Sequence, residues 1–185
     1  MTLGMVLAIF FTAGWIPLYL SRAEDVGEAL PAYESREKLV MVATVVVLSL
    51  HMATGCLLVS LRADIGPGRG ALAAAVYAFG IGFWFWGRRL IGPLKVRRRP
   101  DQPPLRFRRD GAFGIVRHPL YFGCLVAMAA PVVVTLSPWL TVSYACCGLV
   151  LGVRAVQEET RLRAQVGAQY DAYRNEVKRL IPYVW

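Results

Sequence analysis

Long blocks of apolar residues constrain this chain more than any other feature. Five can be read, at residues 2–20, 39–61, 71–87, 120–137 and 139–153. Hydrophobic residues make up 56% of the 185 positions and charged residues 18%, which is too apolar for a soluble domain. A block such as 39–61 is long enough to cross a hydrocarbon core of about 30 Å as a helix. The sequence therefore predicts an all-α, polytopic membrane bundle of about five transmembrane helices.

The first and last blocks need separate consideration. The first lacks a basic segment before it and a small-residue cleavage site, so we expect a retained helix rather than a signal peptide. The last covers only about 22 Å before Arg154. Either this helix crosses the membrane with its charged end lining a polar cavity, or it enters the membrane without spanning it.

The positive charges predict the orientation. The segment 88–117 carries ten cations and the tail after residue 153 carries six, whereas only Arg62 and Arg69 fall between the second and third blocks. The positive-inside rule then places the amino terminus outside and the carboxyl terminus in the cytoplasm. A net charge of +9 is typical of such anchoring and gives no reason to expect a nucleic-acid partner. The four cysteines lie in apolar blocks without a CxxC spacing, so we expect reduced thiols and no metal site.

One polar cluster lies where the fourth block begins, in the string GAFGIVRHPLYFG at 111–123. Pro119 is suited to the first turn of a helix, which places Arg117 and His118 at its cytoplasmic end, beside unpaired backbone N–H groups. Such a position attracts a carboxylate or another anion. In isolation, however, this motif is more simply interpreted as an arginine reaching the headgroups and a histidine capping the helix.

A second polar cluster extends the fifth block. Arg154, Glu158 and Arg161 share one helical face, and Glu159 is the next residue round. The carboxylates suit a cationic ligand group and the arginines an anionic one. A ladder of surface salt bridges, worth about 0.2–0.5 kcal/mol per pair, is the alternative. A tight turn at 137–138 would bring both clusters together into a site for a zwitterion.

The remaining tail shows apolar residues at three- and four-residue steps. They predict an amphipathic helix that folds back over the membrane-side core. These residues are Leu162, Val166, Tyr170, Tyr173, Val177 and Leu180. We divide the chain into residues 1–105, with the first helices and a basic loop, and residues 106–185, with both polar clusters.

The strings GAFGIVRHPLYFG, RAVQEE and GAQYDAYRNEVKRLIP occur in this order over residues 106–182. This pattern resembles the isoprenylcysteine carboxyl methyltransferases and their phospholipid methyltransferase relatives. The resemblance implies an integral membrane methyltransferase that uses S-adenosylmethionine without a soluble Rossmann domain. The chain departs from the family at Ala112-Phe113, where many members have a tyrosine.

The resemblance also implies roles for individual residues. Arg154 and Glu159 would lie at the methyl-transfer centre, where Arg154 could hold an acceptor carboxylate and Glu159 could act as a base or orient the acceptor. The residues implied to hold the cofactor are Arg117, His118, Tyr121 and Glu158, with backbone groups between Gly111 and Val116.

The acceptor is implied to be lipophilic or a small apolar molecule carrying a carboxylate, amine or thiol, reached from the membrane lipid. Two alternatives remain open. One is an NADPH-dependent reductase of the sterol-reductase type, although such proteins commonly have an acidic residue where this chain has Cys124. The other is a non-catalytic, lipid-binding membrane protein. His51 lies in the middle of a predicted span and either lines a substrate tunnel or pairs with a neighbouring helix.

Overall fold

The computed structural model describes residues 2–13, 35–62, 64–91 and 109–185. Every regular element in these ranges is a helix, which confirms the predicted all-α bundle. An amino-terminal helix, Leu3–Ala13, precedes the labelled helices. These are α2 (Ser35–Ser60), α3 (Pro67–Ile91), α4 (Ala112–Ile115), α5 (Pro119–Thr135), α6 (Pro138–Val166) and α7 (Ala168–Glu176).

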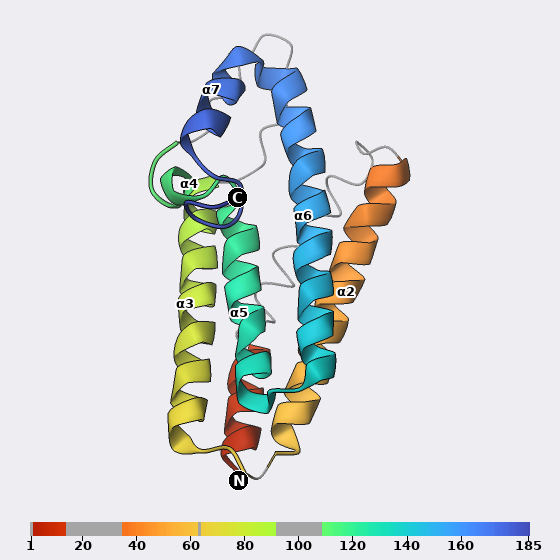
Figure 1. Cartoon of the computed structure of the whole chain (residues 1–185), viewed down its shortest axis with the longest axis vertical. Helices are drawn as coiled ribbons and strands as arrows, with labels where there is room; N and C mark the ends of the chain where they lie inside the picture. Colours follow the sequence, from red (N-terminus) through yellow and green to blue (C-terminus); the bar gives the residue numbers. More distant parts are fainter. Residues whose placement is uncertain (1, 14–34, 63, 92–108) are drawn as a thin grey trace.

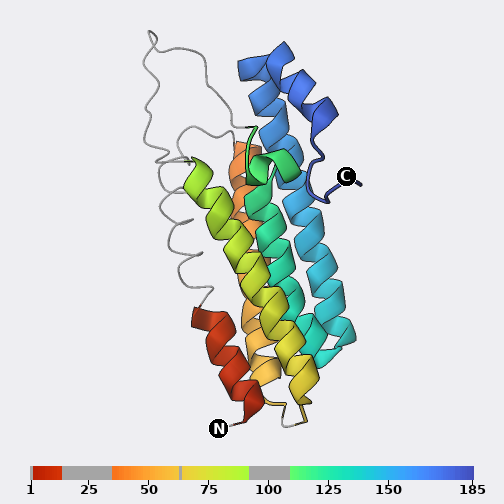
Figure 2. The ribbon, with the colours of Figure 1, turned by 90° about the vertical axis from the view of Figure 1, so that its left-hand side faces the viewer.

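The long helices alternate in direction. Helices α3 and α6 run one way and α2 and α5 the other, so that the end of α3, the start of α5 and the end of α6 share one end of the bundle (Figure 1). Helix α3 packs mainly on α5, and α2 on α6. The amino-terminal helix contacts α3 near the opposite end, where the rings of Phe11 and Tyr77 lie 4.7 Å apart (Figure 2).

Three helices are long and apolar enough to cross a membrane, within Glu37–Ser60, Pro67–Leu90 and Pro138–Ala164. Two apolar helices are shorter, Leu3–Ala13 and α5. The predicted count of five spans therefore stays a prediction. Residues 14–20 of the first apolar block lie outside the described residues.

Helices α3 and α6 differ in extent from the apolar blocks. Helix α3 begins at Pro67, before the apolar block 71–87, and continues past Gly87 to Ile91. Helix α6 runs without a break through Arg154 to Val166. Because α6 is continuous, the residues after 153 lie beyond its apolar segment, and the end of α6 extends past the start of α5 (Figure 1).

The carboxyl-terminal stripe does not form the single amphipathic helix that we predicted. Gly167 interrupts it with φ of +67°, a backbone conformation that favours glycine. Helix α7 ends at Glu176, and the next residues are extended and form a parallel bridge between Lys178 and Val116. Tyr170, Tyr173 and Leu180 are nevertheless buried, because α7 and the tail each cover part of the bundle end.

Glycines allow α3 and α5 to approach closely. A Cβ on Gly80 would lie 2.4 Å from the backbone nitrogen of Ala127, and one on Gly123 would lie 2.7 Å from the carbonyl oxygen of Gly80. Only residues without side chains fit this crossing. The contact fixes the first turns of α5 against the last turns of α3.

His51 links three helices in the bundle interior. Its Nδ1 lies 2.6 Å from the hydroxyl of Ser143 on α6, and its Nε2 lies 3.0 Å from the carbonyl oxygen of Met128 on α5. Of the two roles considered from sequence, pairing with a neighbouring helix is therefore the one observed. The four cysteines are free thiols.

Candidate active site

The two polar clusters of the sequence meet at one end of the bundle. His118 lies in the connection before α5, and its Nε2 is 3.2 Å from Oε1 of Glu159 on α6. Its Nδ1 is 3.6 Å from Oε2 of Glu158. The imidazole therefore lies between two neighbouring carboxylates, although it is about forty residues away along the chain.

Glu159 is the centre of an ion-pair cluster. Its side chain is only 4% exposed, and its oxygens accept hydrogen bonds from Arg117 at 2.9 Å and from Arg179 at 3.0 Å. Nε of Arg174 lies 3.7 Å from Oε2. Buried charges are stable only when paired in this way. Three guanidinium groups thus surround a single buried carboxylate.

Glu158 lies in a different environment. Its side chain is 49% exposed, and its Oε2 accepts a 2.8 Å hydrogen bond from the hydroxyl of Tyr121. The rings of Tyr121 and His118 stack with centroids 5.3 Å apart and planes 3° apart. The pair of aromatic rings therefore orients a carboxylate that is still accessible to a ligand.

The backbone before α5 binds the tail. The N–H of Arg117 donates to the carbonyl of Lys178 at 2.8 Å, and that of His118 donates to the carbonyl of Arg179 at 3.1 Å. The N–H groups of Arg117 and His118 themselves are therefore not available to an anionic ligand. Two carbonyls of the extended tail occupy them, because the tail runs alongside this connection.

The other residues implied to hold the cofactor lie in the same connection. Gly111 precedes α4 with φ of +60° and is exposed, and its N–H and C=O lie near the start of the short helix. Val116 is fully buried, and its N–H donates to the carbonyl of Ala112. The N–H of Val116 is therefore already bonded within the connection.

The arginines of the second cluster diverge. Arg154 is half-buried, one helical turn before Glu158, with a buried Nε. Arg161 instead pairs with Glu37 at the start of α2, at 3.4 Å. Near them, Oε1 of Gln157 is buried and has no hydrogen-bond partner in the described part of the chain. The Arg161 side chain is therefore directed toward α2, away from Glu158.

Helix α7 covers the cluster from the outside. The hydroxyl of Tyr173 donates to the carbonyl of Phe113 at 2.6 Å, and Arg109 donates to the carbonyl of Gln169 at 2.7 Å. Burial raises the pKa of Tyr170 and of Tyr173 well above the usual value for a phenol, and the nearby negative charge of Glu159 raises that of Tyr170 further. Both phenols are therefore neutral near the cluster.

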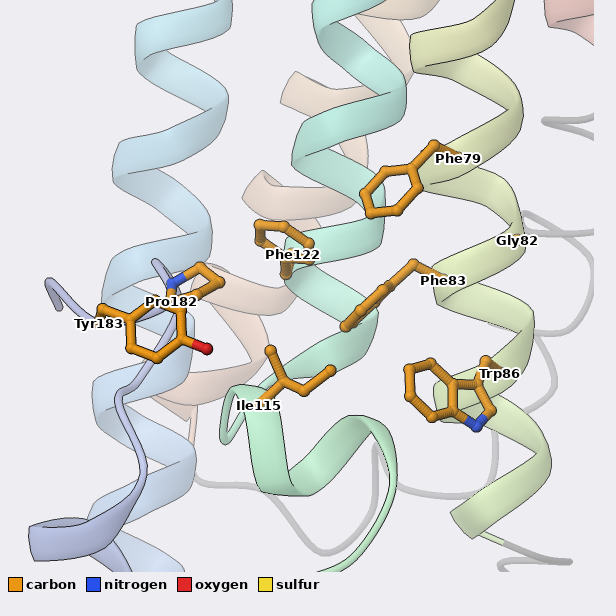
Figure 3. A pocket seen from close by; sticks show the side chains of 8 residues that line it. All are labelled: Phe79, Gly82, Phe83, Trp86, Ile115, Phe122, Pro182 and Tyr183. Carbon is orange, nitrogen blue, oxygen red and sulfur yellow. The ribbon is translucent and has the colours of Figure 1, made fainter.

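An apolar cavity of about 570 Å³ lies beside the cluster. Helix α3, α4, the first turn of α5 and the tail line it, as Figure 3 shows, and it is open to the outside, where Phe79, Trp86 and Tyr183 are exposed. Neither His118, Tyr121 nor either glutamate lines it. The charged cluster and the cavity both adjoin the first turn of α5, where Tyr121 contacts Glu158 and Phe122 lines the cavity.

Arg174 and Arg179 were counted from sequence only as charges that set the orientation of the chain, and neither was predicted to belong to the site. Gly167 is a helix-ending signal, and Pro182 a signal of non-helical chain. These two residues mark the segment in which an extended tail could have been expected.

Comparison with family models, with curated proteins and with solved structures finds no match to this chain.

Proposed function

We propose that the chain is an integral membrane methyltransferase that uses S-adenosylmethionine and acts on a lipophilic or small apolar acceptor. One observation carries the proposal. Arg117, His118 and Tyr121 meet Glu158 and Glu159 at one end of the bundle, in the arrangement that a zwitterionic ligand requires. The resemblance of these same residues to the membrane methyltransferase motif supports it.

The charges fit the amino-acid part of this cofactor. Glu158 is half exposed and held by Tyr121, so its carboxylate is available to an ammonium group. Arg154, one turn earlier on the same helix, could supply a cation for the carboxylate of the cofactor, in place of the acceptor carboxylate that the resemblance implies for it. The proposed cofactor position is therefore the open side of Glu158, because Glu159 is already surrounded by arginines.

When bound, the cofactor supplies a methyl group on a sulfonium, which an acceptor lone pair displaces as the carbon–sulfur bond breaks. A displacement of this kind depends on alignment and on local charge. The residues of this chain would bind the cofactor, orient the acceptor and exclude water. No acid or base is needed on the sulfur side, because the leaving group is a neutral thioether.

Two roles are considered for Glu159, either as a base or as a group that orients its neighbours in the site. Both of its oxygens accept hydrogen bonds from arginines, and His118 adds a third donor. A carboxylate with these partners is a poor proton acceptor. The contacts therefore favour an orienting role, in which Glu159 fixes Arg117 and His118.

The proposed orientation has the amino terminus outside, the site at the cytoplasmic face and five spans. The supporting observation is that the end of α3, the start of α5 and the end of α6 share the end of the bundle that carries the cluster (Figure 1). The two cation-rich segments, 88–117 and the tail after residue 153, are therefore attached to helices at one end of the bundle. Cysteine labelling from each side of sealed vesicles tests this placement.

A thermal-shift comparison tests the activity class. S-adenosylhomocysteine at about 100 times its dissociation constant should stabilise the protein by about 2.7 kcal/mol, because it binds only the folded state. Glu158→Gln should abolish the shift, whereas Arg163→Gln, at an exposed ion pair, should retain it. Stabilisation by NADPH alone would favour the reductase alternative, and no stabilisation by either would favour the non-catalytic one.

A further inference from the structure

Residues 180–185 of the tail form a short segment without any charged side chain. Leu180 is buried against the bundle, but Tyr183 is 92% exposed and Val184 is 73% exposed. Ile181 and Trp185 are exposed as well. Large apolar side chains gathered on a surface in this way usually mark a contact with a protein or a membrane. The segment is therefore a candidate interaction surface.

The segment lies beside the apolar parts of two long helices. The Trp185 ring packs on α6 at Gly152, where a Cβ would come 3.2 Å from the ring. Tyr183 lines the same cavity as Phe79 of α3, which is itself exposed (Figure 3). Both helices are long and apolar enough to cross a membrane. After α7, the chain thus returns to a level at which the outer surface of the bundle is apolar.

The backbone of this segment closes on itself. The N–H groups of Leu180 and Ile181 both donate to the backbone oxygen of Trp185 at 2.7 Å, and those of Val184 and Trp185 donate to the carbonyl of Ile181 at 3.1 Å. Pro182 has no N–H group to satisfy. Unpaired backbone polar groups are costly in contact with lipid. A loop that pairs its own donors is therefore suited to a membrane boundary.

The two aromatic residues of the segment also suit that boundary. Tyr183 has φ of +65°, a conformation that is unfavourable for a bulky residue, yet its ring gains little packing within the chain. Strain of this kind persists where it serves a function. Tyrosine and tryptophan are enriched at membrane–water interfaces, because each joins an apolar ring to one polar group. Tyr183 and Trp185 therefore match the chemistry of the lipid interface.

The segment is connected to the charged cluster through Arg179. The guanidinium of Arg179 lies 4.9 Å from the centre of the Trp185 ring and binds both oxygens of Glu159. The backbone carbonyl of Arg179 accepts the N–H of His118. A lipid contact that holds Trp185 against α6 would therefore also favour the position of Arg179 on Glu159.

We propose that residues 181–185 insert into the membrane interface and that this lipid contact keeps the tail bound to Glu159 and to the start of α5. The partner is the boundary between phospholipid headgroups and acyl chains. Helix α7 stays on the aqueous side, and the segment after it re-enters the membrane. The inference rests on the membrane placement in the proposed function, but not on the methyltransferase activity.

The first test introduces p-benzoylphenylalanine, a photoreactive amino acid, at one position at a time in the full chain, in nanodiscs of phosphatidylcholine with tritiated acyl chains. Position 183 should take up lipid label on irradiation, as should position 149, since Leu149 is 69% exposed in the apolar part of α6. Position 172, at the exposed Ala172 of α7, should take up about tenfold less, because only an interfacial segment reaches the acyl boundary.

The two controls separate the possible failures. Label at 149 with no more at 183 than at 172 would overturn the inference, and the exposed segment would then face water or a protein partner. Absence of label at 149 would instead overturn the membrane placement and, with it, the proposed function.

The second test measures hydrogen exchange at the amides of Arg117 and His118, which carbonyls of the tail protect. Val184→Asp places a charge in the exposed segment and should speed this exchange about tenfold or more in nanodiscs, because the tail opens more often. Asn175→Asp places the same charge on the exposed face of α7 and should leave the exchange unchanged. Exchange that remains slow in α3 and α6 distinguishes release of the tail from unfolding. Equal protection in both variants would overturn the link between lipid contact and the position of the tail.

Discussion

The guanidinium of Arg179 contacts both carboxylate oxygens of Glu159, with Nε–Oε1 and Nη2–Oε2 distances of 3.0 Å. This bidentate pair joins the carboxyl-terminal tail to α6 at the point where Arg117 and His118 also meet Glu159. The Glu159 side chain is only 4% exposed. Its carboxylate is therefore a buried counter-charge for the arginines that contact it. The tail, the start of α5 and α6 are therefore held together by one carboxylate.

Removal of that carboxylate should destabilise the protein strongly. We expect Glu159→Ala to lower the free energy of unfolding by about 3–5 kcal/mol, because it leaves the buried guanidinium of Arg117 without a counter-charge. Asp171→Ala, which breaks exposed pairs with Arg163 and with Arg174, should cost less than about 1 kcal/mol, because both pairs are accessible to water. Denaturant unfolding in detergent measures both, and equal losses would contradict a central role for Glu159.

Tyr121→Phe distinguishes the contribution of the Tyr121 hydroxyl from that of its ring. The variant keeps the stack on His118 but loses the hydrogen bond to Glu158, so the carboxylate is no longer oriented. We expect affinity for S-adenosylhomocysteine to fall about tenfold or more, since hydrogen bonds to charged groups contribute about 1.5–3 kcal/mol. Isothermal titration calorimetry measures the change. An unaltered dissociation constant would exclude Tyr121 from the site.

Two glycines of α3 should respond oppositely to the same substitution. Gly80→Ala should destabilise by about 1–3 kcal/mol, because its Cβ would strike the backbone of α5 at Ala127. Gly82→Ala should be neutral or stabilising by up to about 1 kcal/mol, because its Cβ meets open space and alanine favours the helix. Thermal unfolding of the pair checks this, and similar midpoints would contradict the close approach of α3 and α5.

The buried phenols of α7 predict a loss of stability in alkali. Burial raises the pKa of Tyr170 and Tyr173 in the folded protein above the unfolded value of about 10. Above about pH 10 the unfolded chain therefore loses protons that the folded chain keeps, and stability falls as pH rises. The fall should be smaller in Tyr170→Phe/Tyr173→Phe. Phenolate absorbance would refute the prediction if both residues of the folded protein ionise near pH 10.

Local sequence signals predicted the parts of the site that lie on helices. Pro119 indicated the start of α5, and the spacing of Arg154 and Glu158 placed both on one face of α6. The turn at 137–138 then predicted that His118 would approach Glu158 and Glu159, as the distances confirm.

The tail and the cavity could not be predicted in the same way. The apolar spacing of Val177 and Leu180 fits a helix, but carbonyls of the tail bind the N–H groups of Arg117 and His118 instead. This pairing depends on a contact between segments sixty residues apart, which no local pattern encodes. The cavity likewise depends on where Pro182 lies against α3 and α5.

Ultraviolet cross-linking of tritiated S-adenosylmethionine to the wild-type protein tests the central claim most directly. The account predicts label on peptides that contain residues 111–121 or 154–162, displaced by excess S-adenosylhomocysteine and lost in Glu158→Gln. Label confined to other peptides, or label that the excess ligand does not displace, would contradict a cofactor site at the meeting point of α5 and α6.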